Sequence, residues 1–487
     1  MEGTLPITMY PCVLGLAMEA GHHPNIVWIV IDALRADHTT MDGYERNTTP
    51  NIQAIANEAQ GTAVSNCFSH AIATRPSVSS MLTGVYPSAH GVNMIENAIP
   101  SELQTVPELL SEAGYQSVAI SRNSHVSRAT GLHRGFDEFD WFGSVSSLLE
   151  TVDIDILLKY LLGIRNHSVG FSTDLVDHSI AYIVNELAKR NIRRLNQDAN
   201  PYFMFLHYLG PHDPYLPPIP YQERYLADLG VDRKTAIQVV NHVKEHNWEY
   251  NTGKLELTEE ESEILRAMYD AEVAYTDACV GELFDFITEQ DSPNETLFII
   301  TADHGELLGE RNVIGHEFHL DDALLNVPLV IHGPGSEHVQ SDALVQHIDL
   351  IKTLVEDISG EVEQLQGVDL TSDERDWTVS ERCQPLDFDD LTDINPDFDP
   401  SSIHGDSMRA LRTREFKLIR SATETDLYKL PDEDTDLSEE RPETTTQLRD
   451  ELEQWQETFG QPIGTAREAN LSADMKQQLT DLGYLVD

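Results

Sequence analysis

The chain of 487 residues carries 83 acidic and 32 basic side chains, which gives a formal net charge of −51. This excess of carboxylates argues against nucleic-acid binding through a basic patch. Because the charge is spread along the chain, the composition is typical of proteins from salt-accumulating halophilic archaea, in which solvated carboxylates keep the fold soluble. At molar salt the Debye length is about 3 Å, so this charge would scarcely repel an anionic substrate.

The N-terminus and the cysteines give no sign of export. Residues 1–22 are predicted to form a tail, in which the mildly apolar stretch 5–18 contains two prolines, lacks a basic cluster and is shorter than the ~20 residues that span a bilayer. Met18 is an alternative start. The cysteines lie far apart without paired spacing: Cys12, Cys67, Cys279 and Cys383. We therefore predict a cytoplasmic protein without an integral membrane segment, with peripheral membrane association as the alternative.

Apolar runs and helical periodicity alternate along most of the chain. Strands are predicted near residues 25–31, 117–120, 202–208, 296–301 and 328–332. Helices are predicted near residues 50–59, 76–83, 174–190, 259–289 and 349–357. This alternation predicts an α/β fold with a mostly parallel central sheet between helical layers.

Residues 147–163 have apolar clusters at helical spacing inside an insertion. We predict a helix that packs on the main core. A lid, an oligomer contact and a membrane-associated helix are the alternatives, and the three acidic residues of the segment weaken the last of them.

Thr74 precedes a predicted helix whose first turn contains Pro76 and whose end is marked by Gly84. At a helix N-terminus, backbone N–H groups and the helix dipole favour an anion, so a sulfate or phosphate ester would fit beside this hydroxyl. Taken alone, a threonine at this place is more often a plain helix cap.

Two predicted strands end in residues that bind metals. Asp32 closes the run 25–31, and Asp303 and His304 follow the run 296–301. The C-terminal ends of strands in open α/β sheets are where ligands bind, so these side chains are expected to converge on one site.

These blocks occur in an order that resembles the sulfatase branch of the alkaline phosphatase superfamily. The segments that carry the resemblance include Val30-Ile-Asp32, Thr74-Arg-Pro-Ser-Val-Ser-Ser-Met-Leu-Thr-Gly84, Gly210-Pro-His-Asp-Pro-Tyr215 and Asp303-His-Gly-Glu306. The resemblance implies a three-layer α/β/α catalytic domain over residues 23–375. It also implies a small C-terminal α+β subdomain with an antiparallel sheet over residues 376–487, which includes an acidic linker near 385–400.

The resemblance also implies one divalent metal ion, with Asp32, Thr74, Asp303 and His304 as its ligands. This mixed set of oxygen and imidazole ligands favours Mn, Zn or Fe, with Ca or Mg as the alternatives. A second ion is a further alternative, for which the candidate ligands are His207, His212, Asp213, His316 and His319.

Other residues receive roles from their place in the family pattern. His212 and His316 match positions that contact the transferred group or protonate the leaving oxygen, as a general acid does. His207 alternates with apolar residues on a predicted strand, so core packing or a supporting hydrogen bond is expected there. The candidate substrate-binding residues are Arg75, His90, Asn93, Asn123 and His125.

The chain departs from the typical sulfatase at the nucleophile. A typical sulfatase oxidises a Cys or Ser to formylglycine, whereas Thr74, which stands at that position, carries a methyl group on the same carbon as its hydroxyl and cannot give the aldehyde. Val78 replaces the arginine of the motif, Ala33 replaces the second aspartate of the usual pair, and the lysine expected near Asn123 is missing. In these respects the chain resembles the group with an unmodified threonine, which includes phosphodiesterases and lipoteichoic-acid synthase-like transferases.

We therefore predict a metal-dependent hydrolase that cleaves a phosphate or sulfate ester of a small molecule, glycan or lipid through Thr74, without formylglycine. A phosphate ester is favoured, because water resolves a phosphothreonine more easily than a sulfated threonine. One alternative is a transferase of phosphoethanolamine-like or glycerolphosphate-like head groups to a glycan or lipid. Another is a non-catalytic, sulfatase-like binding protein. The sequence does not predict the oligomeric state.

Overall fold

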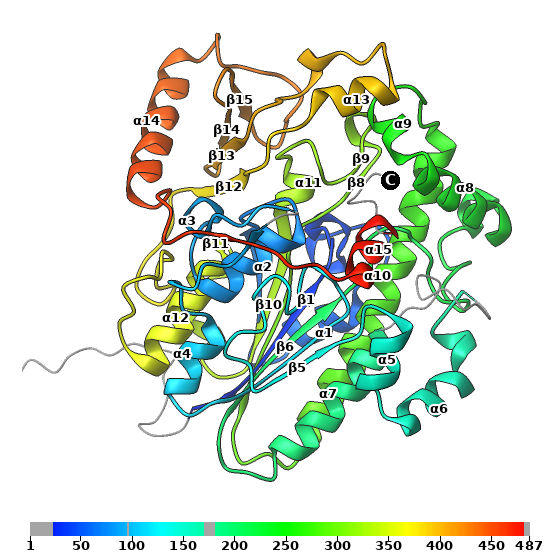
Figure 1. The fold of residues 1–487 in the computed structure, drawn as a ribbon, viewed down its shortest axis with the longest axis vertical. Helices are drawn as coiled ribbons and strands as arrows, with labels where there is room; N and C mark the ends of the chain where they lie inside the picture. The colour runs from blue at the N-terminus through cyan, green and yellow to red at the C-terminus, as the bar shows by residue number, and fades with distance from the viewer. Residues whose placement is uncertain (1–22, 95–96, 170–180, 482–487) are drawn as a thin grey trace, which may run out of the picture.

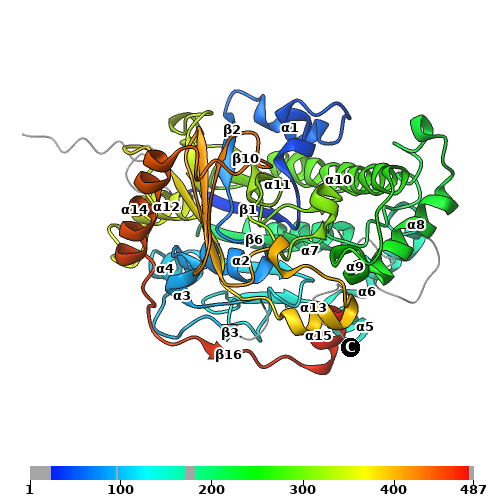
Figure 2. The same cartoon turned by 90° about the horizontal axis from the view of Figure 1, so that it is seen from above.

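The computed structural model describes residues 23–94, 97–169 and 181–481 of the chain. Its centre is an eight-stranded sheet in the order β11-β2-β10-β7-β1-β6-β4-β5. The strands are β1 (Asn25–Ile31), β2 (Gly61–Phe68), β4 (Gln116–Ser121), β5 (Glu138–Trp141), β6 (Tyr202–Tyr208), β7 (Thr296–Ala302), β10 (Asn326–His332) and β11 (Leu344–Gln346). Helices cover both faces of this sheet, which gives three layers (Figures 1 and 2).

The three central strands fix the edge at which the predicted site residues emerge. β1 pairs in parallel with β6 and with β7, and in this register Ile31 lies opposite both Tyr208 and Ala302. All seven side chains of β1 are buried, which explains its continuous apolar run. Residues that follow these three strands therefore leave the sheet side by side at one edge.

The predicted α/β fold with a mostly parallel sheet is confirmed. β10 departs from it, since it runs antiparallel to both of its neighbours, β2 and β7. The sequence patterns did not predict β2, β5 or β11. β2 buries only part of its side chains, and β5 and β11 are short edge strands, so none of them carries a long apolar run.

Two groups of helices form the outer layers. One contains α1 (Pro50–Ala56), α7 (Ala181–Leu195) and α10 (Glu259–Thr288), and the other contains α2 (Thr74–Thr83), α4 (Val106–Glu112) and α12 (His347–Ser359). α2 begins at Thr74, two residues before the predicted start, and ends at Thr83, where it is capped by Gly84, whose φ of 71° suits glycine. The short helix α3 (Pro87–His90) follows it. The predicted helix near 174–190 lies partly outside the described residues.

A separate four-stranded antiparallel sheet forms the core of the C-terminal region (Figure 1). Its strands are β12 (Thr378–Arg382), β13 (Met408–Arg412), β14 (Phe416–Arg420) and β15 (Thr425–Lys429), and α14 (Pro442–Thr458) packs beside them. The acidic stretch 385–400 contains helix α13 (Phe388–Ile394), which buries Leu391. The last described helix, α15 (Ala473–Asp481), returns to the large domain, where Gln478 Nε2 donates a hydrogen bond to Arg122 O.

The insertion 147–163 forms helices α5 (Val145–Thr151) and α6 (Ile154–Leu162). α6 buries Ile156 and Tyr160, so one face packs on the core as predicted. Large apolar side chains are nevertheless exposed along this segment: Leu149, Ile154, Leu158, Leu161 and Leu162. Among the described residues, no helix has the length and apolar character needed to cross a membrane.

Candidate active site

Two neighbouring strands end in carboxylates at one edge of the central sheet. Asp32 follows β1 and Asp303 follows β7. These carboxylates and the imidazole of His304 each offer a ligand atom within 4.8 Å of the other two, and all three side chains are fully buried. His304 Nε2 lies 3.4 Å from Asp32 Oδ1 and 3.9 Å from Asp303 Oδ2. We call these three residues the Asp32 cluster.

The hydroxyl of Thr74 faces the Asp32 cluster. Thr74 Oγ1 lies 3.4 Å from Asp32 Oδ1 and 3.3 Å from His304 Nε2. Thr74 is the first residue of α2, so the unpaired first-turn N–H groups of the helix lie around it. A hydroxyl oxygen, three side chains that could hold a metal ion and the positive end of a helix dipole therefore meet at one place.

Backbone contacts hold Asp303 and His304 in this arrangement. His304 Nδ1 lies 2.8 Å from Gly305 O, so Nδ1 carries the proton and Nε2 presents its lone pair to the cluster. The carbonyl oxygen of Asp303 accepts hydrogen bonds from Ser77 Oγ, at 2.7 Å, and from Ser69 Oγ. Ser77 lies one turn after Thr74 on α2, so its hydrogen bond connects α2 to the end of β7. Sequence reasoning did not find either serine.

Asn123 orients Asp32. Asn123 Nδ2 donates a 2.8 Å hydrogen bond to Asp32 Oδ2, which leaves Oδ1 directed towards Thr74 and His304. The backbone N–H of His125 in turn donates to Asn123 Oδ1 at 2.8 Å. Arg75, which follows Thr74, donates from Nε to His125 Nδ1 at 3.1 Å. Three predicted substrate-binding residues thus form a hydrogen-bonded chain behind the Asp32 cluster: Arg75, Asn123 and His125.

His207, on β6, contacts both carboxylates. Its Nε2 lies 3.4 Å from Asp303 Oδ2 and 4.0 Å from Asp32 Oδ2, and its side chain is fully buried. Of the two roles expected from the sequence, this geometry matches the supporting hydrogen bond.

Burial and charge act together on these groups. Burial, and then the charge of Asp303, raise the pKa of Asp32. Burial would also raise the pKa of Asp303, but His304 and His207 lower it below its ordinary value. Burial lowers the pKa of His304, which keeps the imidazole in the neutral form that binds metals. Two buried carboxylates are costly without a compensating charge, and a divalent cation between them would supply it.

A second group of polar side chains lies beside the first. His212, Asp213 and Glu306 each offer a ligand atom within 4.8 Å of the other two, and we call them the Glu306 cluster. His212 Nδ1 lies 3.1 Å from Asp213 Oδ1, and His316 Nδ1 lies 3.0 Å from Glu306 Oε1. The ring centroids of His212 and His316 lie 6.4 and 4.4 Å from that of His304. The predicted catalytic histidines therefore lie next to each other and close to His304 of the Asp32 cluster. Sequence reasoning missed Glu306, and its only signal was its place two residues after His304.

The remaining predicted substrate-binding residues lie farther along the chain, on and just after α3. His90 uses both ring nitrogens locally, since Nε2 lies 3.1 Å from Ser80 Oγ and Nδ1 accepts from the N–H of Val92 at 3.0 Å. It therefore ties α3 to α2, and in this conformation neither nitrogen is left for a substrate. Asn93 lines a pocket of about 270 Å³ between α3 and the C-terminal sheet, together with Arg382.

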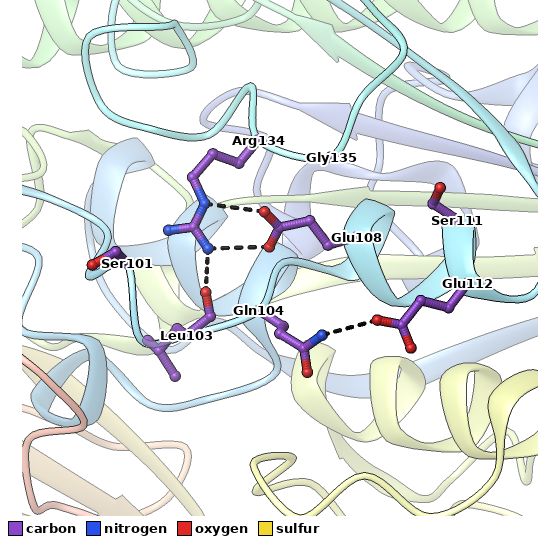
Figure 3. Close-up of a pocket in the computed structure, with 8 residues that line it drawn as sticks. All are labelled: Ser101, Leu103, Gln104, Glu108, Ser111, Glu112, Arg134 and Gly135. Atoms are coloured by element: carbon purple, nitrogen blue, oxygen red, sulfur yellow. Dashed lines mark hydrogen bonds and ion pairs between the residues drawn. The ribbon is translucent and has the colours of Figure 1, made fainter.

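A surface pocket of about 450 Å³ shares no residue with either cluster (Figure 3). It lies beside α4, and its polar side chains pair with one another. Arg134 bonds to Glu108 and Gln104 bonds to Glu112 (Figure 3). These groups are already satisfied, so the pocket offers no chemistry comparable to that of the two clusters.

Comparison with known proteins identifies the family. The family model described as Sulfatase matches residues 24–357, a range that contains both clusters and Thr74. The chain belongs to the sulfatase family. It is 24% identical over 341 residues to the sulfatase YidJ of Escherichia coli (strain K12), covering 68% of this chain and 67% of that protein. It is 26% identical over 349 residues to an arylsulfatase of Clostridium perfringens, and the match covers 64% of this chain and 69% of that protein.

Solved structures share the fold of this sulfatase-family protein. The phosphonate monoester hydrolase SpPMH from Silicibacter pomeroyi matches it with a TM-score of 0.66 at 21% identity, covering 90% of this chain and 96% of that chain. BT4656, solved in complex with its substrate D-glucosamine-2-N,6-O-disulfate, matches with a TM-score of 0.66 at 18% identity, covering 90% and 98%. Membership of the family makes the protein an ester hydrolase of the sulfatase class, and the solved structures support its fold.

Sulfatase-family enzymes are metal-dependent, and the residues of the Asp32 cluster fit a divalent ion. The cluster brings together two carboxylates and an imidazole whose Nε2 lone pair points at them. Carboxylate and imidazole donors suit Mn, Zn or Fe, whereas Ca and Mg prefer oxygen ligands alone.

Proposed function

We propose that the protein hydrolyses a phosphate ester, with the unmodified hydroxyl of Thr74 as its nucleophile, and that sulfate esters are poorer substrates. The observation that carries this proposal is the position of Thr74 Oγ1, 3.4 Å from Asp32 Oδ1 and 3.3 Å from His304 Nε2, at the first turn of α2. The methyl group of Thr74 supports an unmodified nucleophile, because oxidation at that carbon could not give an aldehyde.

The choice between phosphate and sulfate follows from how the covalent intermediate is released. The Thr74 oxygen attacks the phosphorus, the bond to the leaving alcohol breaks, and water then attacks the phosphothreonine and restores the hydroxyl. In formylglycine enzymes a second hydroxyl on the same carbon expels sulfate, and Thr74 has none. A sulfated threonine would therefore persist, whereas a phosphothreonine is open to attack by water.

The surrounding residues take supporting roles in this proposal. Asp32, Asp303, His304 and Thr74 would hold one divalent ion, which when bound lowers the pKa of the hydroxyl and offsets negative charge on the ester. His212 or His316 gives a proton to the leaving oxygen. Asn123 holds Asp32 in place, and Arg75 supplies positive charge beside the nucleophile. Asn93 lines one small pocket with Ala73 and Pro76, next to Thr74, and it also lines the pocket of about 270 Å³, which would receive the body of a substrate.

We also propose that the protein is adapted to high salt, as proteins of halophilic archaea are. Its net charge of −51 supports this proposal. Repulsion among its carboxylates is screened over about 10 Å at 0.1 M salt and about 3 Å at 1 M salt. Activity is therefore expected to rise between these KCl concentrations. Activity that falls across the same range would contradict this adaptation.

The experiment presents p-nitrophenyl phosphate, bis(p-nitrophenyl) phosphate and p-nitrophenyl sulfate to the protein in high KCl with Mn²⁺. We expect turnover of the phosphate esters, and a loss of at least about 10³-fold in kcat for Thr74→Ala. Thr74→Ser keeps the hydroxyl and should retain turnover. Thr83→Ala is the matched control, since Thr83 is buried on the same helix and its hydroxyl donates to Ser79 O.

Two outcomes would overturn the proposal. Turnover of the sulfate ester alone would refute the preference for phosphate. Unchanged turnover by Thr74→Ala would remove Thr74 as the nucleophile.

A further inference from the structure

We propose that His212, Asp213 and Glu306 form a second divalent-cation site beside the Asp32 cluster. His212 and Asp213 lie on the loop after β6, and Glu306 lies on the turn after β7. Their ligand atoms lie within 4.8 Å of one another. Ligands held about 2.0–2.4 Å from one ion lie at most about 4.8 Å apart, so the separations in this cluster meet the upper limit for three residues that share an ion.

Glu306 provides a second, independent observation. Its side chain is fully buried, and its Oε1 lies 3.0 Å from His316 Nδ1. Its Oε2 has no hydrogen-bond partner within the described part of the chain. A buried carboxylate oxygen without a donor is costly, and a cation would satisfy it. The contact with His316 would then hold the carboxylate from the opposite side, as second-layer histidines and carboxylates do around metal ions.

The composition of the cluster indicates which cation it would hold. One imidazole and two carboxylates match Zn or Mn better than Ca, which takes oxygen ligands. Three protein ligands leave at least one coordination position open, as in catalytic sites. That position can take a water molecule or a substrate oxygen.

A cation at this site would give His212 and His316 different roles, whereas the proposed function allows either of them to protonate the leaving oxygen. When His212 binds the cation, His316 is the imidazole left to protonate the leaving oxygen. This division rests on the proposed function, whereas the cation site itself does not.

The test counts ions. The protein is stripped with a chelator in high KCl, titrated with MnCl₂ in a calorimeter, and analysed for Mn after desalting. We expect two Mn per chain in the wild type and one in Glu306→Gln. Asp213→Asn should also hold one Mn per chain. It changes a partly exposed side chain, so it serves as a second variant if Glu306→Gln folds poorly. Asp303→Asn should lose the ion of the Asp32 cluster.

Glu272→Gln is the matched control. Glu272 lies on α10 and is buried, and Gly210, two residues before His212, packs against its carboxyl group. Burial raises the pKa of Glu272 to about 8, so glutamine resembles its neutral form. This variant should keep two Mn per chain.

The outcome that would overturn the inference is one Mn per chain in the wild type, lost in Asp303→Asn and kept in Glu306→Gln. The metal count also separates this inference from the proposed function. If the wild type holds two ions and does not cleave p-nitrophenyl phosphate, the proposed function fails and the second site stands. If it cleaves that ester with one ion, the second site fails and the proposed function stands.

Discussion

The Asp32 cluster and the Glu306 cluster differ in how the fold holds them. Asp32 and Asp303 directly follow adjacent central strands, and hydrogen bonds from Asn123 and Ser77 hold them further. The Glu306 cluster draws on a loop and a turn, and Glu306 keeps one oxygen without a hydrogen-bond partner among the described residues. We expect the Asp32 cluster to keep its geometry without an ion, whereas the Glu306 cluster depends more on its cation.

Asp32→Asn should give the largest effect of the changes that test this comparison. It removes one of the two carboxylate charges of the Asp32 cluster and keeps the side-chain size, so binding of the ion that is proposed to activate Thr74 should be lost or weakened. Turnover of p-nitrophenyl phosphate should fall by at least about 10³-fold. Mn analysis should still find the ion of the Glu306 cluster. Turnover within tenfold of the wild type would contradict the role of Asp32.

Glu272→Gln shows what burial does to a carboxyl group outside both clusters. Burial raises the pKa of Glu272 to about 8 from an ordinary 4.5, against a hydrogen bond from Leu216 that lowers it. The folded protein keeps this proton up to about pH 8, whereas the unfolded chain releases it near 4.5. The contribution of Glu272 to the free energy of unfolding therefore falls as pH rises, by about 3 kcal/mol between pH 4 and pH 7.

Glu272→Gln should not lose stability in this way as pH rises, because glutamine does not titrate. Urea unfolding of the wild type and the variant at a series of pH values in high KCl measures both free energies of unfolding. The difference between them should grow with pH in favour of the variant. A difference that does not change with pH would show that Glu272 is ionised in the folded protein.

Asn123→Ala tests whether hydrogen bonding makes the Asp32 cluster rigid. Without the amide, Asp32 Oδ2 loses its 2.8 Å donor and the carboxylate can rotate. Changes in such supporting residues cost about 10–100-fold in metal affinity or activity, and the Mn affinity of the first site should fall within that range. Asn185→Ala is the control, since Asn185 is buried but donates to Cys279 O. Equal affinities in Asn123→Ala and the wild type would show that Asn123 does not orient the ligand.

The sequence predicted those parts of the molecule in which a local pattern of residues is enough to specify a strand or a helix. β1, β6 and β7 are buried along their length, so their apolar runs marked them, and the residues after β1 and β7 marked the Asp32 cluster. Pro76 and Gly84 marked the helix that begins near Thr74, and the order of the family's sequence blocks then gave Thr74 its predicted role.

The rest depends on contacts between distant segments. Glu306 lies beside His212 only because the loop after β6 meets the turn after β7. His90 was expected at the substrate, but its hydrogen bonds with Ser80 and Val92 follow from how α3 turns back on α2. For α6 the sequence favoured a face packed on the core and left an exposed face among the alternatives, because periodicity shows that a helix has an apolar face but not whether that face is covered.

The proposed mechanism requires Thr74 itself to become covalently modified during turnover. The most direct measurement mixes the protein with p-nitrophenyl phosphate in high KCl and Mn²⁺, quenches with acid within one turnover, and analyses the peptide that contains Thr74 by mass spectrometry. We predict one added phosphoryl group on Thr74, absent from Thr74→Ala and from protein quenched before mixing. Hydrolysis of the ester with Thr74 unmodified at every quench time would show that Thr74 is not the nucleophile.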